Sequence, residues 1–181
     1  ICGFKRWLKV TVNILNKKII SFSLFSYIKS LLLLMKPRVM SLVIFTSTVG
    51  LLTAPVTISF YDSVVGIFFV AMGAGAAGAL NMWWEADLDA VMKRTSKRPI
   101  PSGRISSADA LAFGVILAML SVMMLSIFAN LLSALILAVT ILFYLLIYTI
   151  WLKRLTPQNI VIGGAAGAFP PIIGWCIVSG D

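Results

Sequence analysis

Long apolar runs separated by short charged segments dominate the chain. An α-helix rises about 1.5 Å per residue and needs about 20 apolar residues to cross the hydrocarbon core of a bilayer. Five runs reach roughly this length, so we expect membrane-spanning helices near residues 39–56, 64–84, 110–129, 131–152 and 160–178. The pattern therefore predicts an all-α fold, a polytopic bundle of transmembrane helices.

Turn and cap residues indicate where these helices begin, reverse or break. Asn favours turns, so Ala129-Asn130 should separate the third and fourth spans. The spacing of Ser106 and Asp109 is that of a capping box opening the third span. Thr156-Pro157 reads as an N-cap followed by a proline at the first helical position of the fifth span. Pro170-Pro171 should break that last helix near its middle.

Small residues mark the faces where helices should pack closely. Ala71, Gly75 and Ala79 recur at every fourth position of the second span, and Gly163 and Gly167 form a GxxxG pattern in the fifth. Such residues allow helix backbones to approach each other in membranes. The GAGAAG string of the second span also fits a dinucleotide fingerprint, but it lies inside an apolar span and not between a strand and a helix, which excludes that interpretation.

Composition agrees with the membrane interpretation. Hydrophobic residues make up 60% of the chain and charged residues only 12%, whereas a soluble domain carries roughly a quarter of charged residues. The chain has no histidine, which argues against histidine triads and most zinc sites, and its two cysteines, Cys2 and Cys176, show neither a disulfide framework nor a metal motif.

The net charge of +9 has a topological explanation. Lys and Arg of membrane proteins concentrate in cytoplasmic segments. All 15 of them lie before the first predicted span, after the second or after the fourth: Lys5, Arg6, Lys9, Lys17, Lys18, Lys29, Lys36 and Arg38; Lys93, Arg94, Lys97, Arg98 and Arg104; Lys153 and Arg154. We therefore expect a cytoplasmic N-terminus and a lipid bilayer, not a nucleic acid, as the partner of this charge.

Residues 1–35 form a basic N-terminal segment without any acid. Within it, residues 19–35 could lie in the membrane interface as an amphipathic helix, or the segment could be a mitochondrial transit peptide. Residues 36–181 form the predicted transmembrane domain.

An acidic stripe follows the second span. Asn81, Glu85 and Asp89 are spaced four residues apart, which places them on one face of a helix, whereas Asp87 lies off that face. The two carboxylates repel each other unless a cation relieves their charge, and the amide adds a further oxygen to this surface. Mg²⁺ suits such a set, because it binds one or two carboxylates and completes its shell with water and phosphate oxygens. The alternative is a solvated helix end with ordinary surface acids.

A basic loop comes directly after the acidic stripe and contains Lys93, Arg94, Lys97 and Arg98. Acids that hold a metal and cations that neutralise phosphate oxygens are together what a diphosphate requires. Two further basic pairs are predicted on the same membrane face and could converge on the site, although each can equally be a topology determinant: Lys36 with Arg38, and Lys153 with Arg154.

These motifs resemble the aspartate-rich motif of the UbiA superfamily of intramembrane prenyltransferases, approximately NDxxDxxxD. Asn81, Glu85 and Asp89 match its Asn and its two later acids, while Met82 stands where an acid is usual. The strings LMKPRV, RTSKRPIPSGR and YTIWLKRLTPQNIVIGGAAGAFPPIIGW resemble the branch of the family that farnesylates protohaem. The resemblance covers roughly residues 27–181.

The resemblance implies a bundle of nine spans, of which this chain holds about five, and a second acidic motif after the fifth span. The chain is thus expected to be the N-terminal part of a prenyltransferase domain and inactive alone. The implied reaction transfers a farnesyl group from farnesyl diphosphate to a vinyl group of protohaem IX, giving haem O. Carried over by motif, Asn81, Glu85 and Asp89 would be the catalytic residues that hold Mg²⁺. The implied diphosphate-binding residues are Arg94, Lys97 and Arg98, with Arg38, Lys153, Arg154 and Tyr148 as further candidates.

Two other functions remain open from the sequence. A related enzyme could prenylate an aromatic quinone precursor, although the stretch 148–175 speaks against it. A transporter or channel without catalysis would be expected to carry ionisable residues deep in its spans, where this chain has none. The expected location is a bacterial plasma membrane in preference to a mitochondrial inner membrane, with the loops of the site on the cytoplasmic side.

Overall fold

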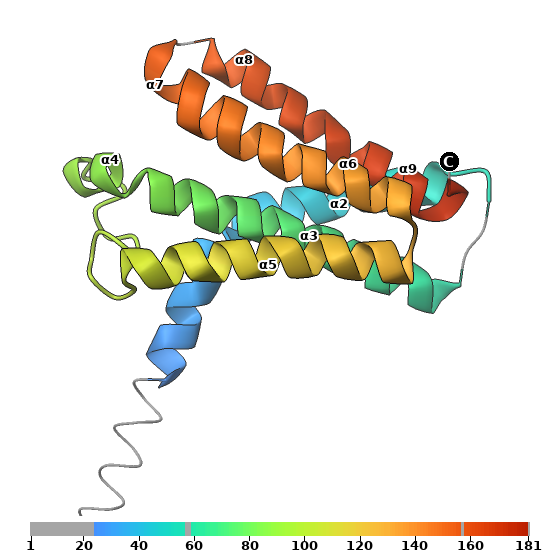
Figure 1. Cartoon of the computed structure of the whole chain (residues 1–181), viewed down its shortest axis with the longest axis horizontal. Helices are drawn as coiled ribbons and strands as arrows, with labels where there is room; N and C mark the ends of the chain where they lie inside the picture. Colours follow the sequence, from blue (N-terminus) through green and yellow to red (C-terminus); the bar gives the residue numbers. More distant parts are fainter. Residues whose placement is uncertain (1–23, 57–58, 157, 181) are drawn as a thin grey trace, which may run out of the picture.

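The computed structural model describes residues 24–56, 59–156 and 158–180, and every regular element among them is helical (Figure 1). The N-terminal stretch up to residue 23, which includes residues 19–23 of the predicted interfacial segment, lies outside the described residues. The described chain starts with helix Leu24–Leu34. The other elements are α2 (Pro37–Thr53), α3 (Phe60–Trp84), α4 (Ala86–Val91), α5 (Ser107–Phe128), α6 (Leu131–Leu142), the π-helix η1 (Phe143–Leu152), α7 (Lys153–Leu155), α8 (Asn159–Gly164), the 3₁₀ helix η2 (Ala165–Ala168) and α9 (Phe169–Ser179).

Five apolar helices occur where the hydrophobic pattern predicts them. Four are long and apolar enough to cross a membrane: Phe60–Trp84, Ser107–Phe128, Leu131–Leu155 and Asn159–Ser179. The first predicted span is α2, a helix of 17 residues, which is the lower end of the length that a membrane-spanning helix needs. The prediction of an all-α, multi-pass membrane bundle is confirmed.

Most of the predicted helix ends are also confirmed. Asn130 caps α6, since its side chain accepts a hydrogen bond from the backbone N–H of Ser133. Ser106 caps α5 by accepting from the N–H of Asp109. The two prolines of α9 occupy its first turn, and the 3₁₀ turn η2 in front of them interrupts the last span as predicted.

The fifth span begins where the apolar run predicts, but its predicted N-cap, Thr156, is wrong by two residues. Helix α8 begins at Asn159 with Gln158 as its N-cap. The Thr156 hydroxyl still accepts from the backbone N–H of Gln158, but Thr156 has an extended backbone and stands outside the helix. Thr156 therefore belongs to the turn between α7 and α8 and is not the N-cap of α8.

Helix α3 occupies the centre of the bundle. Its most apolar 18-residue window is 56% buried, against 17–28% for the other long spans. It contacts α2, α5, α6, η1 and α9, and Figure 1 shows α5 running alongside it. Its small residues explain this position, because Ala71, Gly75 and Ala79 are buried and Gly75 lies against Met35.

The closest helix crossing is between α2 and α9. A Cβ atom placed on Gly50 would lie 1.9 Å from the carbonyl oxygen of Pro171, and one on Gly174 would lie 1.9 Å from that of Ser47. The predicted GxxxG pair behaves differently. Gly163 lies against the ring of Tyr148, but nothing lies within 4 Å of a Cβ on Gly167. Among the described residues Gly167 therefore packs against no other helix, unlike Gly163.

Candidate functional site

The predicted acidic stripe lies at one end of α3 and is buried. Asn81 is in the last turn of α3, Glu85 stands at the junction with α4, and Asp89 is in α4. The backbone bonds from Glu85 N–H to Asn81 and from Asp89 N–H to Glu85 keep the i, i+4 register across the junction. The three side chains share one face, with residue exposures of 0%, 5% and 4%. Buried acids exclude the alternative of a solvated helix end.

Three cations from separate segments contact this stripe. Arg98 donates to both carboxylate oxygens of Asp89, at 2.8 and 2.7 Å. The ammonium group of Lys153, from α7, forms an ion pair with Glu85. The ammonium group of Lys36 donates to the side-chain oxygen of Asn81. The tertiary structure therefore gathers three positive charges around two negative ones.

Lys36 contributes to the site in place of the predicted Arg38. Its backbone has a left-handed conformation, φ +52°, which is unusual for a residue other than glycine. The N–H groups of Val39 and Met40 donate to its carbonyl. This sharp turn before α2 directs the Lys36 side chain inwards and leaves Arg38 exposed. Burial, assisted by the neighbouring charge of Arg98 and opposed by that of Glu85, lowers the pKa of Lys36 to about 8.

The π-helix η1 provides a second set of contacts, in which sequence reasoning named Tyr148 but missed Thr149 and Tyr144. The Asn81 amide nitrogen donates to the Thr149 hydroxyl at 2.9 Å, and that hydroxyl donates to the Tyr144 carbonyl at 2.9 Å. The rings of Tyr144 and Tyr148 pack with centroids 5.0 Å apart, and Lys153 lies 5.6 Å from the centre of the Tyr148 ring. Side chains in a π-helix do not follow the 3.6-residue period of an α-helix. The contact of Thr149 with Asn81 could therefore not be predicted from helical periodicity.

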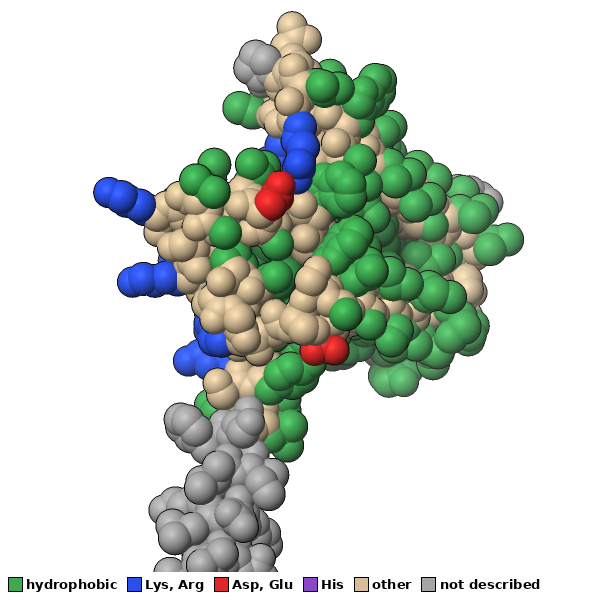
Figure 2. Space-filling model, turned by 60° about the vertical axis from the view of Figure 1, so that its left-hand side comes forward, with side chains coloured by type: hydrophobic (Ala, Val, Ile, Leu, Met, Phe, Trp, Pro, Cys, Tyr) green, Lys and Arg blue, Asp and Glu red, His purple; other side chains and the backbone are tan. Residues whose placement is uncertain are grey.

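The basic loop divides into one buried contact and an exposed surface. Of the three loop residues implied for diphosphate binding, only Arg98 touches the stripe, whereas Arg94 and Lys97 are exposed. Buried Thr95 donates its hydroxyl to the Asp89 carbonyl and anchors the loop to α4. In Figure 2 the basic side chains lie on the left and at the upper centre of the view, and hydrophobic side chains cover most of the right-hand part.

Arg154 and Asp87 form a separate pair on the surface. The guanidinium of Arg154 donates to both carboxylate oxygens of Asp87, at 3.0 and 3.1 Å, and to the Trp84 carbonyl at 3.3 Å. It also lies 5.5 Å from the Trp84 ring. The Asp87 side chain is 61% exposed. This pair therefore ties α7 to the α3–α4 junction outside the buried stripe.

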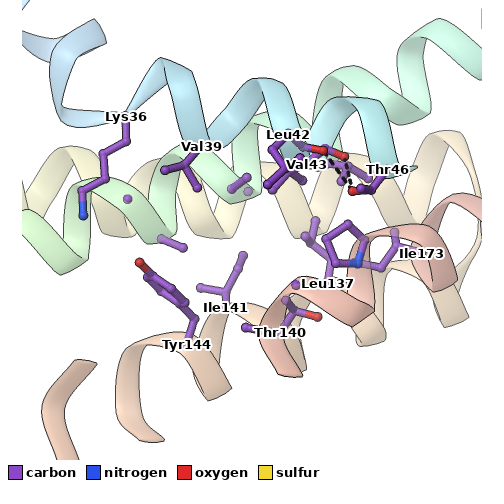
Figure 3. A pocket seen from close by; sticks show the side chains of 18 of the residues that line it. Lys36, Val39, Leu42, Val43, Thr46, Leu137, Thr140, Ile141, Tyr144 and Ile173 are labelled. Atoms are coloured by element: carbon purple, nitrogen blue, oxygen red, sulfur yellow. Dashed lines mark hydrogen bonds between the residues drawn. The ribbon is translucent and has the colours of Figure 1, made fainter. Parts of the chain in front are cut away.

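An apolar cavity of about 310 Å³ extends from Lys36 into the bundle (Figure 3). Lys36 and Tyr144 line one part of it, and Thr46 and Ile173 line another. Most of the remaining wall comes from aliphatic side chains and small residues of α2, α3, α6 and the last span: Val39, Leu42, Val43, Val70, Gly73, Ala74, Ala77, Gly78, Leu137, Ile141, Gly163, Gly164, Ala166, Gly167 and Pro170. Its volume lies at the lower end of the range for small-molecule sites.

The donor set of the stripe fits a hard divalent cation. Asn81, Glu85 and Asp89 offer buried oxygen atoms, the class of ligand that Mg²⁺ prefers. Among the described residues no group of three or more His, Cys, Asp or Glu could hold a metal. A Mg²⁺ ion bound by two carboxylates and one amide would still have open coordination positions. Water and phosphate oxygens would fill these positions, as is common for Mg²⁺.

The comparisons with known proteins agree on one family. Residues 42–181 match the UbiA prenyltransferase family. Over 148 residues the chain is 63% identical to protoheme IX farnesyltransferase 2 of Mesorhizobium japonicum, covering 82% of this chain and 47% of that protein. It is 58% identical over 164 residues to protoheme IX farnesyltransferase of Pelagibacter ubique, covering 91% and 54%. The chain thus spans about half the length of the curated relatives that it matches.

A solved structure supports the same architecture. The fold matches a structure of digeranylgeranylglyceryl phosphate synthase with a TM-score of 0.73 over 84% of this chain and 54% of that one. The two sequences are 22% identical, so this likeness concerns the fold alone.

Proposed function

The chain belongs to the UbiA prenyltransferase family, and from this premise we propose that the full-length protein transfers a farnesyl group from farnesyl diphosphate to a vinyl group of protohaem IX, giving haem O. The names of the relatives, protoheme IX farnesyltransferase, support this choice of substrates. The structural observation that carries the proposal is a buried cluster of acids and cations at one end of an apolar cavity.

The apolar cavity and the charged cluster suit different parts of the donor substrate. An isoprenyl chain is apolar and gains free energy by leaving water for a hydrophobic wall, which the cavity provides. A diphosphate needs positive charge and hydrogen-bond donors, which Lys36, Arg98 and Lys153 provide. Lys36 takes part in both, because it lines the cavity and contacts Asn81.

Departure of diphosphate is the step that this electrostatic arrangement assists. The bond between the farnesyl carbon and its oxygen breaks, and both electrons leave with the diphosphate. Preorganised cations stabilise the negative charge that develops there. The vinyl electron pair forms the new bond to the farnesyl carbon, and water adds to the resulting cation and loses a proton. We propose that Asn81, Glu85 and Asp89 hold Mg²⁺, which when bound polarises and neutralises phosphate oxygens.

The ion pairs of the structure indicate how the cations would pass from the acidic side chains to the diphosphate when the substrate binds. Lys36, Arg98 and Lys153 contact the oxygens that are proposed to hold the metal. A bound diphosphate would offer them stronger negative charge, so they would turn to it and free the acidic oxygens for Mg²⁺. The exposed Arg94, Lys97 and Arg38, together with Arg154 and Tyr148, remain candidates for less direct contacts.

The decisive experiment supplies the full-length protein with tritium-labelled farnesyl diphosphate and either haem or 4-hydroxybenzoate. We expect label in haem that depends on Mg²⁺ and disappears on addition of EDTA. Label in 4-hydroxybenzoate with unlabelled haem would replace this function by prenylation of a quinone precursor. Undiminished transfer in EDTA would contradict the magnesium assignment while leaving the transferase activity in place.

A further inference from the structure

Asn81 depends on its neighbours for the direction of its side chain. An amide has two different ends: the oxygen only accepts hydrogen bonds, and the nitrogen only donates them. Only the oxygen can bind a cation. Asn81 is completely buried, so bulk water cannot determine which end faces the acidic stripe. The groups that touch the amide must determine it.

Thr149 contacts the nitrogen end of the amide and favours this orientation. It is 1% exposed and receives a hydrogen bond from the Asn81 nitrogen at 2.9 Å. A hydroxyl has one proton to donate, and Thr149 donates it to the Tyr144 carbonyl at 2.9 Å. Only the lone pairs of the Thr149 oxygen are then free to interact with Asn81. They accept a hydrogen bond from the amide nitrogen and repel the amide oxygen.

The π-helix makes this arrangement possible. In an α-helix a threonine hydroxyl bonds to the carbonyl three or four residues earlier, whereas Thr149 and Tyr144 are five residues apart within η1. The opposite end of the amide faces a cation already, because the oxygen accepts from the ammonium group of Lys36.

We propose that Thr149 is a positioning residue, which holds the Asn81 amide by its nitrogen and leaves the oxygen on the side of Lys36, where it can bind the divalent cation. The inference rests on the proposed function, in which Asn81 is a metal ligand. It adds to the site a residue outside the aspartate-rich motif. It also gives the π-helix η1 a role, which is to hold the Thr149 hydroxyl against Asn81.

The test measures metal binding directly, apart from turnover. In the full-length protein, binding of Mn²⁺ as a paramagnetic substitute for Mg²⁺ is followed by electron paramagnetic resonance in the presence of inorganic diphosphate. Thr149→Val keeps the shape of the side chain and removes the hydroxyl. We expect it to weaken Mn²⁺ binding by about 10- to 100-fold, the usual effect of removing a group that orients a ligand.

Two further variants separate orientation from packing. Thr149→Ser retains the hydroxyl and should bind Mn²⁺ nearly as the parent protein does. Thr48→Val makes the same chemical change in α2, where the hydroxyl bonds to the Ile44 carbonyl of its own helix, and should leave binding unchanged. If Thr149→Val reduces the folded yield, Thr149→Ala gives the same measurement.

A change at Asn81 itself provides the sharpest control. In Asn81→Asp both ends of the side chain accept hydrogen bonds, so no orientation remains to be fixed. Adding Thr149→Val to that background should weaken Mn²⁺ binding far less than it does beside Asn81. Equal losses in both backgrounds would overturn the inference, as would unchanged binding in Thr149→Val or no Mn²⁺ binding by the parent protein. Transfer of labelled farnesyl to haem is measured separately, so a failed acceptor assignment would not be mistaken for a failure of this one.

Discussion

At the scale of single residues, the site consists of buried charges that compensate one another. Asp89 pairs with Arg98, and Glu85 with Lys153, while both acids are almost inaccessible. Removing one member of a buried ion pair leaves the other uncompensated, which costs more than the pair itself contributes. Substitutions that retain shape are therefore more informative here than truncation to alanine.

Neutralising either acid should impair transfer more than folding. We expect Glu85→Gln and Asp89→Asn to lower kcat/KM by about 100-fold or more, comparable to the loss of one preorganised electrostatic contact in a transition state. The matched control is Asp62→Asn, an exposed acid in the first turn of α3, at its other end. Thermal unfolding in detergent checks that the variants fold, and parental turnover in both would refute the assignment.

Lys36 and Arg38 offer a matched comparison two residues apart. Lys36→Met should raise the KM for farnesyl diphosphate by about tenfold or more, since a hydrogen bond to a charged group contributes about 1.5–3 kcal/mol. Arg38→Met should remain close to the parent protein, because Arg38 is exposed. Steady-state kinetics with both variants decide between them, and a larger effect of Arg38→Met would reverse our assignment.

At the scale of elements, two irregular features shape the site. The turn at Lys36 directs a cation into the bundle, and the π-helix η1 brings Thr149 and Lys153 to the acidic stripe. Apart from the 3₁₀ turn η2, the other long helices are regular, and some of them depend on small residues to approach each other. The crossing of α2 and α9 forms part of the wall of the cavity, so its closeness matters for function as well.

The α2–α9 crossing should not tolerate a single added methyl group. Gly174→Ala would place a carbon against the Ser47 carbonyl, and we expect it to destabilise the protein by about 1–3 kcal/mol through overpacking. Gly164→Ala is the control, since nothing lies within 4 Å of that position. Unfolding temperatures in detergent compare the two variants, and equal temperatures would show that the crossing adapts.

The cavity should limit the length of the donor chain. Ala77 lines it from α3, so we expect Ala77→Phe to raise the KM for farnesyl diphosphate by about tenfold, a loss of about 1.4 kcal/mol, and to affect geranyl diphosphate less. Ala112→Phe makes the same change on the exposed side of α5. Competition between labelled farnesyl and geranyl diphosphate gives the ratio of their kcat/KM values. An unchanged ratio would show that the prenyl chain does not occupy this cavity.

At the scale of the whole molecule, the charged end of the bundle predicts its orientation in the membrane. Lys93, Arg94 and Lys97 are exposed beyond α4, and such residues remain on the cytoplasmic side. In a Cys2→Ser background, Ser102→Cys should react with a membrane-impermeant thiol reagent only from the cytoplasm. Pro55→Cys, after α2, should react only from the opposite side. The reverse pattern of labelling would invert the topology.

The sequence by itself determined the helices and the main motif. Apolar runs of membrane length, the caps at Ser106 and Asn130 and the prolines of α9 act locally, so they could be identified from neighbouring residues alone. The stripe of Asn81, Glu85 and Asp89 lies within two turns and follows from helical spacing.

Only the tertiary structure decided which distant groups meet that stripe. Lys36, Arg98 and Lys153 come from three segments, and whether each reaches the stripe depends on the left-handed turn, the fold of the loop and the π-helix. Thr149 could not be found from a pattern because its role depends on a carbonyl five residues earlier and on an amide 68 residues away. Local periodicity determines a helix face, whereas an electrostatic site requires contacts that form only when the helices pack.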